Sequence, residues 1–169
     1  MAKIAIIGTG YVGLSSAVGF AHLGHDVVGI DIDESKVEKL TSGKSPIFEK
    51  NIEKFLSKSL KKKKIVFSTD YKKISNCKFV FLCLPTPQLD DGSADTSYIL
   101  EASKLLSKHL KDSATLVIKS TVPVNTWKKV KEVLNRSDIS IVSNPEFLRE
   151  GTALDDFFKP DRIVVGSED

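Results

Sequence analysis

The sequence predicts an α/β fold built on a doubly wound, mostly parallel sheet. Short apolar runs rich in β-branched residues alternate with longer amphipathic segments, which implies strands joined by crossover helices. The chain has 169 residues, 41% of them hydrophobic, which is enough for one domain around one sheet. Because no repeat, low-complexity stretch or Gly/Ser-rich linker divides the chain, we treat residues 1–169 as a single domain.

The expected strands are continuous apolar runs, as in strands that are buried on both faces. They are predicted over residues 3–8, 26–31, 65–69, 79–84, 115–120 and 139–143, with a further strand over 162–166. In a parallel sheet the carboxyl ends of the strands lie along one edge, and ligands bind beyond that edge. We therefore expect functional residues in the segments that directly follow the strands.

The expected helices are the amphipathic segments 12–23, 34–41, 52–60, 96–110 and 124–134. Asp95 is expected to cap the fourth of these helices, and Pro123 to preset the first turn of the fifth. Four lysines at 61–64 follow the third helix, where cations complement the negative end of the helix dipole. Because no aromatic residues are interleaved with them and the net charge is only +3, nucleic-acid binding is not expected.

Membrane insertion, metal binding and disulfide bonds are not expected from this sequence. Its longest apolar runs are far shorter than the roughly 20 residues that a membrane helix needs, and its first residues lack the layout of a signal peptide. We therefore expect a cytoplasmic protein. Cys77 and Cys83 form neither a disulfide framework nor a zinc pattern, so we expect both thiols to be reduced and predict no metal site.

A glycine-rich turn, "GTGYVG", joins the first predicted strand to the first predicted helix. Gly8 is expected to make the tight turn, Gly10 to let the backbone approach a pyrophosphate, and Gly13 to allow close packing of helix on strand. The N-terminus of the helix offers unpaired N–H groups to phosphates. With its strand before and its helix after, the motif predicts a Rossmann-type dinucleotide-binding domain.

The second predicted strand ends at Asp31, about 20 residues beyond the glycines. A carboxylate at this position accepts hydrogen bonds from both hydroxyls of the adenosine ribose and repels a 2′-phosphate. No arginine stands beside Asp31 to receive such a phosphate, so the sequence favours NAD over NADP. The alternative is a domain of the same fold that binds no nucleotide.

The segments after the fourth, fifth and sixth strands complete a resemblance to the nucleotide-sugar 6-dehydrogenases, and most closely to the UDP-glucose 6-dehydrogenases. It is carried by "GTGYVG", "GKSPIFE", "PTP...DGSADTSYI", "KSTVPV", "NPEFLREGTALDDF" and "PDRIVVG", in the family's order and spacing. The resemblance implies two NAD-dependent hydride transfers that oxidise the C6 hydroxyl of a UDP-sugar to a carboxylate, through a thiohemiacetal and a thioester on a cysteine. It also implies an N-terminal NAD domain, a long central dimerisation helix and a C-terminal domain that completes the sugar-nucleotide site.

Only the NAD domain of that plan is expected in these residues. The nucleophile of the family lies in a glycine-rich segment of the C-terminal domain, and no such segment occurs here. Cys83 lies inside an apolar strand and Cys77 lies in a polar turn with no activating base nearby, so neither is expected to replace it. We expect the N-terminal domain of a longer, homo-oligomeric enzyme of UDP-glucuronate and polysaccharide biosynthesis, inactive by itself.

The resemblance also implies roles for single residues. Cofactor contacts are expected from Gly8, Gly10, Tyr11, Val12, Gly13, Asp31, Lys36, Thr86, Thr121 and Glu150. Glu146 is similar to the general base of the family, and Thr121 to a residue that positions the hydrolytic water. Contacts to the UDP-sugar substrate are expected from Glu146, Phe147, Leu148, Arg149 and Glu150. Without the resemblance, Glu146 and Glu150 would be interpreted as two carboxylates at a helix start, stabilised by its dipole.

Alternatives to UDP-glucose and to catalysis remain open in the sequence. Relatives that act on N-acetylated UDP-sugars differ after the first glutamate of "EFLREGTALDDF", whereas GDP-mannose dehydrogenases share "EFLRE". A stand-alone NAD-sensing module is a further alternative, but it would not require "KSTVPV" or "NPEFLREG". A 3-hydroxyacyl-CoA dehydrogenase would be expected to carry a catalytic histidine in this domain, and none of the three histidines follows a predicted strand into the cleft.

Overall fold

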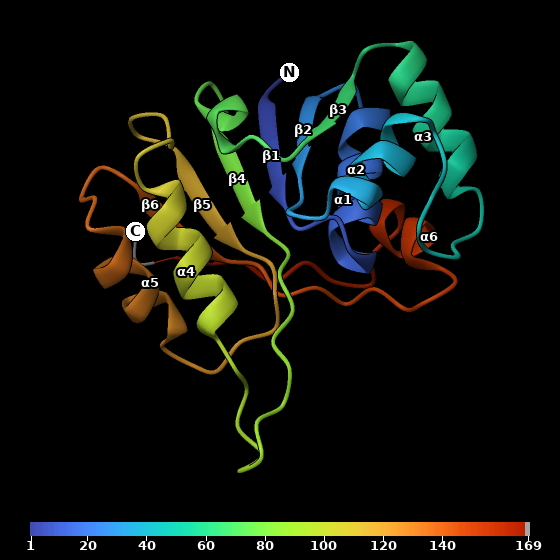
Figure 1. Cartoon of the computed structure of the whole chain (residues 1–169). Helices are drawn as coiled ribbons and strands as arrows, with labels where there is room; N and C mark the ends of the chain where they lie inside the picture. The colour runs from blue at the N-terminus through green and yellow to red at the C-terminus, as the bar shows by residue number, and fades with distance from the viewer. Residues whose placement is uncertain (168–169) are drawn as a thin grey trace.

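A seven-stranded sheet forms the centre of the computed structural model, which describes residues 1–167 (Figure 1). The strands are β1 (Lys3–Ile7), β2 (Asp26–Ile30), β3 (Ile65–Ser68), β4 (Phe79–Leu82), β5 (Thr115–Ile118), β6 (Ser140–Ser143) and β7 (Gly166–Ser167). The α-helices are α1 (Tyr11–His22), α2 (Glu34–Thr41), α3 (Ile52–Lys61), α4 (Ser97–Leu106), α5 (Thr126–Leu134) and α6 (Ala153–Phe158), and the 3₁₀ helix η1 covers Tyr71–Ile74.

The strand order is β3-β2-β1-β4-β5-β6-β7, and every pairing is parallel except β6 with β7. The chain builds outward from β1 to β3, then returns to place β4 on the other side of β1. This reversal makes the carboxyl ends of β1 and β4 the switch point at which doubly wound sheets bind ligands. The predicted doubly wound, mostly parallel sheet is therefore confirmed.

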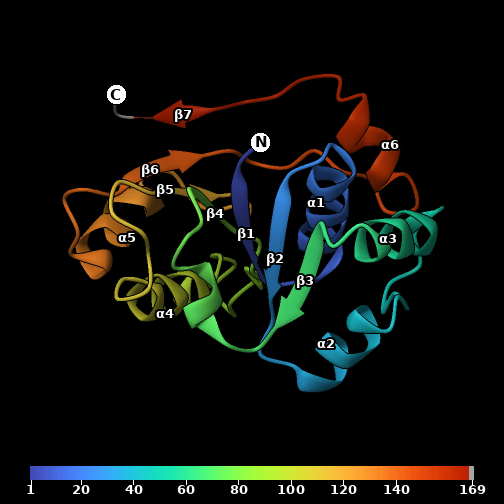
Figure 2. The same ribbon diagram turned by 90° about the horizontal axis from the view of Figure 1, so that it is seen from above.

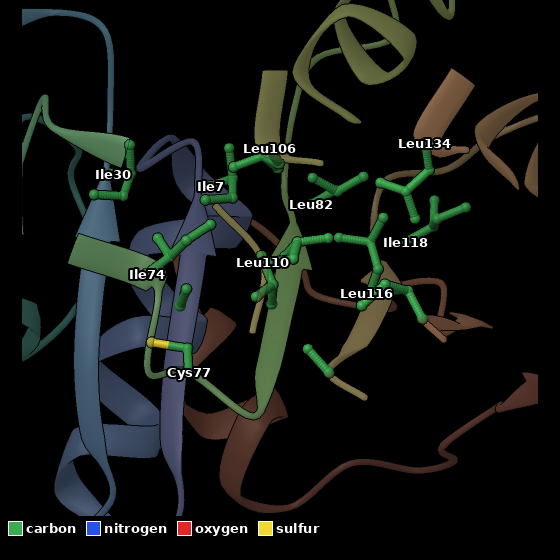
Figure 3. Packing of buried hydrophobic residues seen from close by; sticks show 14 of the residues in the cluster. Ile7, Ile30, Ile74, Cys77, Leu82, Leu106, Leu110, Leu116, Ile118 and Leu134 are labelled. Carbon is green, nitrogen blue, oxygen red and sulfur yellow. The ribbon is translucent and has the colours of Figure 1, made fainter. Parts of the chain in front are cut away.

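Two apolar cores cover the two faces of the sheet because alternate residues of each strand point to opposite sides. In β1, Ala5 and Ile7 join the core beneath α4 and α5, whereas Ile4 and Ile6 join the core beneath α1, α2, α3 and α6. Figure 2 shows these two sets of helices on either side of the sheet, and Figure 3 shows the packing of the first core. Burial on both faces explains why the strands are continuous apolar runs.

Several predicted boundaries need correction. The predicted strand 162–166 is wrong for most of its length, because β7 begins only at Gly166 and the backbone of 162–165 pairs with no strand. Instead, the side-chain amide of Asn144 donates a hydrogen bond to the carbonyl of Val164 at 2.8 Å. The fourth predicted helix ends at Leu106 rather than at residue 110. The short elements η1 and α6 were not predicted.

The two predicted helix starts are each displaced. Thr96 is the N-cap residue of α4, although the Asp95 carboxylate accepts a bond from the backbone N–H of Ser97 at 2.8 Å. Helix α5 begins at Thr126, whose hydroxyl donates to the carbonyl of Pro123 at 2.7 Å. Within residues 1–167, no helix is both long and apolar enough to cross a membrane.

Candidate functional site

The glycine turn after β1 is compressed between β4 and the first turn of α1. Gly8 has a φ of +86°, and a Cβ there would lie 2.5 Å from the carbonyl oxygen of Cys83 at the end of β4. A Cβ on Gly13 would lie 1.9 Å from the carbonyl oxygen of Gly8. Both positions therefore require glycine for the fold itself, because α1 starts in direct backbone contact with the turn.

Gly10 differs from both, because a Cβ at this position would meet no atom within 4 Å. It is the N-cap residue of α1, with a φ of −70° that other residues adopt freely. The first turn of α1 has no side-chain cap and no acidic residue. The arrangement leaves open space in front of helix N–H groups that carry partial positive charge, which suits an approaching pyrophosphate.

Asp31, directly after β2, is buried and held by several donors. Its Oδ2 accepts hydrogen bonds from the backbone N–H and the hydroxyl of Thr9, both at 2.8 Å, and from Lys36 Nζ at 3.0 Å. Burial alone would raise the pKa of Asp31, but these bonds outweigh it and lower the pKa below its ordinary value. Asp31 is therefore a fixed carboxylate beside the glycine turn.

Thr9 was missed in the sequence, although it is fully buried and supplies two of the bonds that orient Asp31. The sequence signal for it is a β-branched hydroxyl residue between the first two glycines of the turn. In the structure its backbone N–H faces Asp31, directly after β2. Thr9 therefore connects the glycine turn to the carboxylate that follows β2.

A cleft of about 590 Å³ opens beyond the carboxyl ends of β1, β2, β4 and β5. Most of the predicted cofactor residues line it, together with the predicted general base: Gly8, Gly10, Tyr11, Val12, Asp31, Lys36, Thr86, Thr121 and Glu146. Gly13 is buried within the first turn of α1, and Glu150 does not line the cleft. Ile32 and Tyr71 also line it without having been predicted, since Tyr71 belongs to the short η1 helix.

Two hydroxyl residues join the loops that follow β4 and β5. Ser120 Oγ accepts a bond from the N–H of Leu84 at 2.9 Å and lies 2.7 Å from the carbonyl oxygen of Leu84, to which it can donate. The Thr86 hydroxyl donates to the carbonyl of Thr121 at 2.9 Å. The "PTP" and "KSTVPV" segments therefore meet at the cleft, and Figure 1 shows the rest of the β4–α4 connection projecting away from the sheet.

The segment "NPEFLREG" after β6 is a loop, and no helix begins at either of its glutamates, so the helix-start interpretation is wrong; α6 begins only at Ala153. Glu146 is half-buried and faces the cleft, and its Oε2 accepts a bond from the N–H of Leu148 at 2.7 Å. The next three residues, Phe147, Leu148 and Arg149, line a second cavity of about 610 Å³. The loop thus contributes to both cavities.

Arg149 anchors this loop to α6. Its backbone N–H, its Nε and its NH2 group bond to the carboxylate of Asp156 at 2.9, 3.2 and 2.6 Å. These bonds lower the pKa of Asp156 to about 2, so the pair is charged throughout the neutral range. The loop is therefore fastened at its middle to the helix that follows it.

Neither cysteine has the surroundings of a nucleophile. Both thiols are free and buried, and burial raises the pKa of Cys77 to about 11 and that of Cys83 to about 12. Among residues 1–167, no group of three or more His, Cys, Asp or Glu side chains could hold a metal ion. The side chains that line the cleft include carboxylates, hydroxyls and the ammonium group of Lys36.

Comparison with known proteins identifies similar chains along the whole length. The model of the UDP-glucose/GDP-mannose dehydrogenase family, NAD binding domain, matches residues 2–169. Protein MJ1054 of Methanocaldococcus jannaschii, described as uncharacterized, is 49% identical over 98% of this chain and 19% of its own length. The UDP-glucose 6-dehydrogenase of Rhizobium meliloti is 42% identical over 97% of this chain and 39% of its own length.

The solved structures give the same result. The structure of a UDP-glucose dehydrogenase from Pyrobaculum islandicum superposes with a TM-score of 0.92 and is 40% identical, covering 100% of this chain and 41% of that chain. The chain therefore spans less than half the length of each of these similar proteins.

Proposed function

Because the chain belongs to the UDP-glucose/GDP-mannose dehydrogenase family as its NAD binding domain, we propose that it is the cofactor domain of a UDP-glucose 6-dehydrogenase. The single observation that carries the proposal is the cleft in which the glycine turn, Asp31, Thr86, Thr121 and Glu146 come together. The first four suit a dinucleotide, whereas a general base at the same edge is needed only for chemistry on a substrate.

The residues present fit NAD. The open space at Gly10 admits a pyrophosphate to the N-terminus of α1, and the fixed carboxylate of Asp31 suits the ribose hydroxyls. Lys36 bonds to the same carboxylate and lines the cleft, which supports a contact with the adenosine part of the cofactor. Thr86 and Thr121 also line the cleft and are proposed to contact the nicotinamide end.

The proposed reaction assigns proton transfer to this chain. Bound NAD supplies the hydride acceptor for each of the two oxidations at C6 of the sugar. Glu146 accepts the proton that leaves the hydroxyl and later the proton of the hydrolytic water, and Thr121 orients that water. Glu150, with the backbone of residues 147–149, is proposed to contact the sugar nucleotide.

The rest of the reaction is proposed to need further domains. A thiolate must trap the aldehyde as a thiohemiacetal, which the second oxidation converts to a thioester. The buried thiols of Cys77 and Cys83 do not suit that role. We therefore propose a C-terminal partner domain that carries the nucleophile, in a homo-oligomeric cytoplasmic enzyme that supplies UDP-glucuronate for polysaccharide biosynthesis.

Turnover tests the proposal in two steps. The 169-residue chain incubated with NAD and UDP-glucose should produce no NADH above a protein-free control, because the nucleophile and most sugar-nucleotide contacts are missing. The Rhizobium meliloti enzyme, with its NAD domain replaced by this chain, should release two NADH per UDP-glucose. Glu146→Gln should suppress that activity.

The exchanged enzyme does not decide the substrate alternative, because its Rhizobium meliloti domain supplies most of the sugar-nucleotide contacts. This chain joined to its own C-terminal partner domain should release NADH with UDP-glucose and little NADH with GDP-mannose; a preference for GDP-mannose would move the assignment to the other named activity of the family. Two NADH per sugar from the isolated chain would instead show that its own thiols suffice.

A further inference from the structure

Three segments far apart in the sequence meet at the hydroxyl of Tyr11. Tyr11 is the first residue of α1, directly after the open glycine position. Its hydroxyl donates a hydrogen bond to Oε2 of Glu49, in the connection between α2 and α3, and accepts one from the N–H of Gly151. The glycine turn, the α2–α3 connection and the loop after β6 are thus joined through one oxygen atom.

The protons at this junction can be assigned. Burial raises the pKa of Tyr11 to about 12, assisted by the bond to Glu49 and opposed by the bond from Gly151. The phenol is therefore protonated at neutral pH, so its single proton goes to the carboxylate and a lone pair receives the Gly151 N–H. The carbonyl of Arg149 lies 3.4 Å from the same hydroxyl, which leaves it a weaker, competing acceptor.

Glu49 has no role in the cofactor cleft. It does not line that cleft, yet only 6% of its surface is exposed, which is unusual for a carboxylate. Among the described residues, the side chain of Glu49 accepts its hydrogen bond from the Tyr11 hydroxyl. A buried carboxylate without a catalytic or cofactor contact needs another reason to be there, and orientation of Tyr11 supplies one.

The loop that receives this bond carries the proposed substrate contacts. Residues 146–152 are fastened elsewhere by the Arg149–Asp156 pair and by the bond between Glu146 and Leu148, but the first joins the loop to α6 and the second lies within the loop, so neither joins it to α1. Gly151, at a φ of +87°, turns its N–H toward Tyr11. Among the hydrogen bonds described for residues 146–152, the bond from the Gly151 N–H to the Tyr11 hydroxyl therefore joins the end of this loop to the start of α1.

We propose that Tyr11 and Glu49 are positioning residues that hold the loop 146–152 against the cofactor turn, so that Glu146 and Glu150 face a bound sugar nucleotide. The role toward substrate rests on the proposed function, whereas the closure of the loop does not. Tyr11 then serves the cofactor through its backbone at the helix N-terminus and the substrate loop through its hydroxyl.

Hydrogen exchange tests the closure without any ligand. Tyr11→Phe and Glu49→Leu should each raise amide exchange in residues 146–152 by about tenfold or more, the effect of losing one charge-assisted hydrogen bond. Glu49→Gln keeps an acceptor oxygen and should restore most of the protection. Tyr98→Phe is the matched control, because the Tyr98 hydroxyl has no hydrogen bond among the described residues, and it should leave the exchange of the loop unchanged.

Two further readouts separate positioning from general stability and from cofactor contact. The melting temperature identifies any variant that unfolds, and if Tyr11→Phe does, the two Glu49 variants carry the test. NADH affinity, titrated by fluorescence, should change less than about threefold, because phosphate contacts at a helix N-terminus come from the backbone. In the domain-exchanged enzyme, both Tyr11→Phe and Glu49→Leu should raise KM for UDP-glucose while leaving KM for NAD close to that of the parent.

The proposal would be overturned if amide exchange in residues 146–152 were as slow in both Tyr11→Phe and Glu49→Leu as in the unaltered chain. It would also be overturned if these variants lost much of their NADH affinity while the exchange of the loop stayed the same. An unaltered chain that fails to bind NADH would refute the proposed function instead. The hydrogen-exchange result would still test the closure of the loop, because that measurement uses no ligand.

Discussion

Replacing Gly10 by alanine should weaken NAD binding while leaving the fold intact. A Cβ at Gly10 meets no atom within 4 Å, and its φ of −70° suits any residue. Alanine is a poorer N-cap residue than glycine, which destabilises the folded chain, but it also restricts the unfolded chain, which stabilises the fold. The two effects should cancel to within about 1 kcal/mol in the free energy of unfolding. The methyl group would instead occupy the space that a pyrophosphate needs.

The expected loss of affinity follows from the phosphate contacts. Displacing the pyrophosphate from the N–H groups of α1 forfeits at least one hydrogen bond to a charged group, worth about 1.5 kcal/mol or more, so NADH affinity should fall at least about tenfold. Isothermal titration measures the affinity, and urea unfolding measures the stability.

Gly13→Ala is the matched contrast. Its Cβ would lie 1.9 Å from the Gly8 carbonyl oxygen, so α1 would have to move, and we expect a stability loss of about 1–3 kcal/mol or more, typical of overpacking. Undiminished NADH binding by Gly10→Ala would refute the reasoning about phosphate approach. Loss of the fold in Gly10→Ala would refute the reasoning about open space.

Three other results are expected. The pKa of Asp31 is lowered in the folded chain, so its ionised form stabilises the fold. This stabilisation is complete above the unfolded pKa of Asp31 and is lost as the pH falls through its folded pKa. The free energy of unfolding of Asp31→Asn, measured in urea, should therefore lack this part of the pH dependence. Gly19→Ala places a Cβ 2.4 Å from the ring of Phe157 and should lower the melting temperature by separating α1 from α6, and an unchanged melting temperature would show that the ring simply rotates away. Cys77 and Cys83, with pKa values of about 11 and about 12, should resist alkylation near pH 8 in the native chain but react in urea, whereas rapid native labelling would contradict their burial.

The sheet was predictable because burial on both faces leaves a strong mark on the sequence. Each strand from β1 to β6 contains a run of apolar residues, and α2 begins and ends at the predicted residues. The short elements were harder: η1 has four residues and α6 has six, too few for helical periodicity to emerge. The run "RIVVG" has the composition of a strand, but β7 begins only at its final glycine.

The site was predictable as a set of segments but not as a set of contacts. Parallel strands bring their carboxyl ends to one edge, so Asp31, Thr121 and Glu146 were expected near the glycine turn. The bonds from Thr9 to Asp31 and from Tyr11 to Glu49 depend on side-chain rotamers and on how close two distant segments come. Periodicity and spacing do not encode such distances, whereas the folded backbone does.

Cofactor preference tests the central claim most directly, because it depends on the glycine turn and on Asp31 together. Titration of the chain with NADH and NADPH under identical conditions should give at least about tenfold tighter binding of NADH, since a 2′-phosphate placed against the Asp31 carboxylate adds like-charge repulsion. Asp31→Asn should weaken NADH binding and narrow the difference in affinity between NADH and NADPH. Equal or tighter binding of NADPH by the unaltered chain would contradict the account.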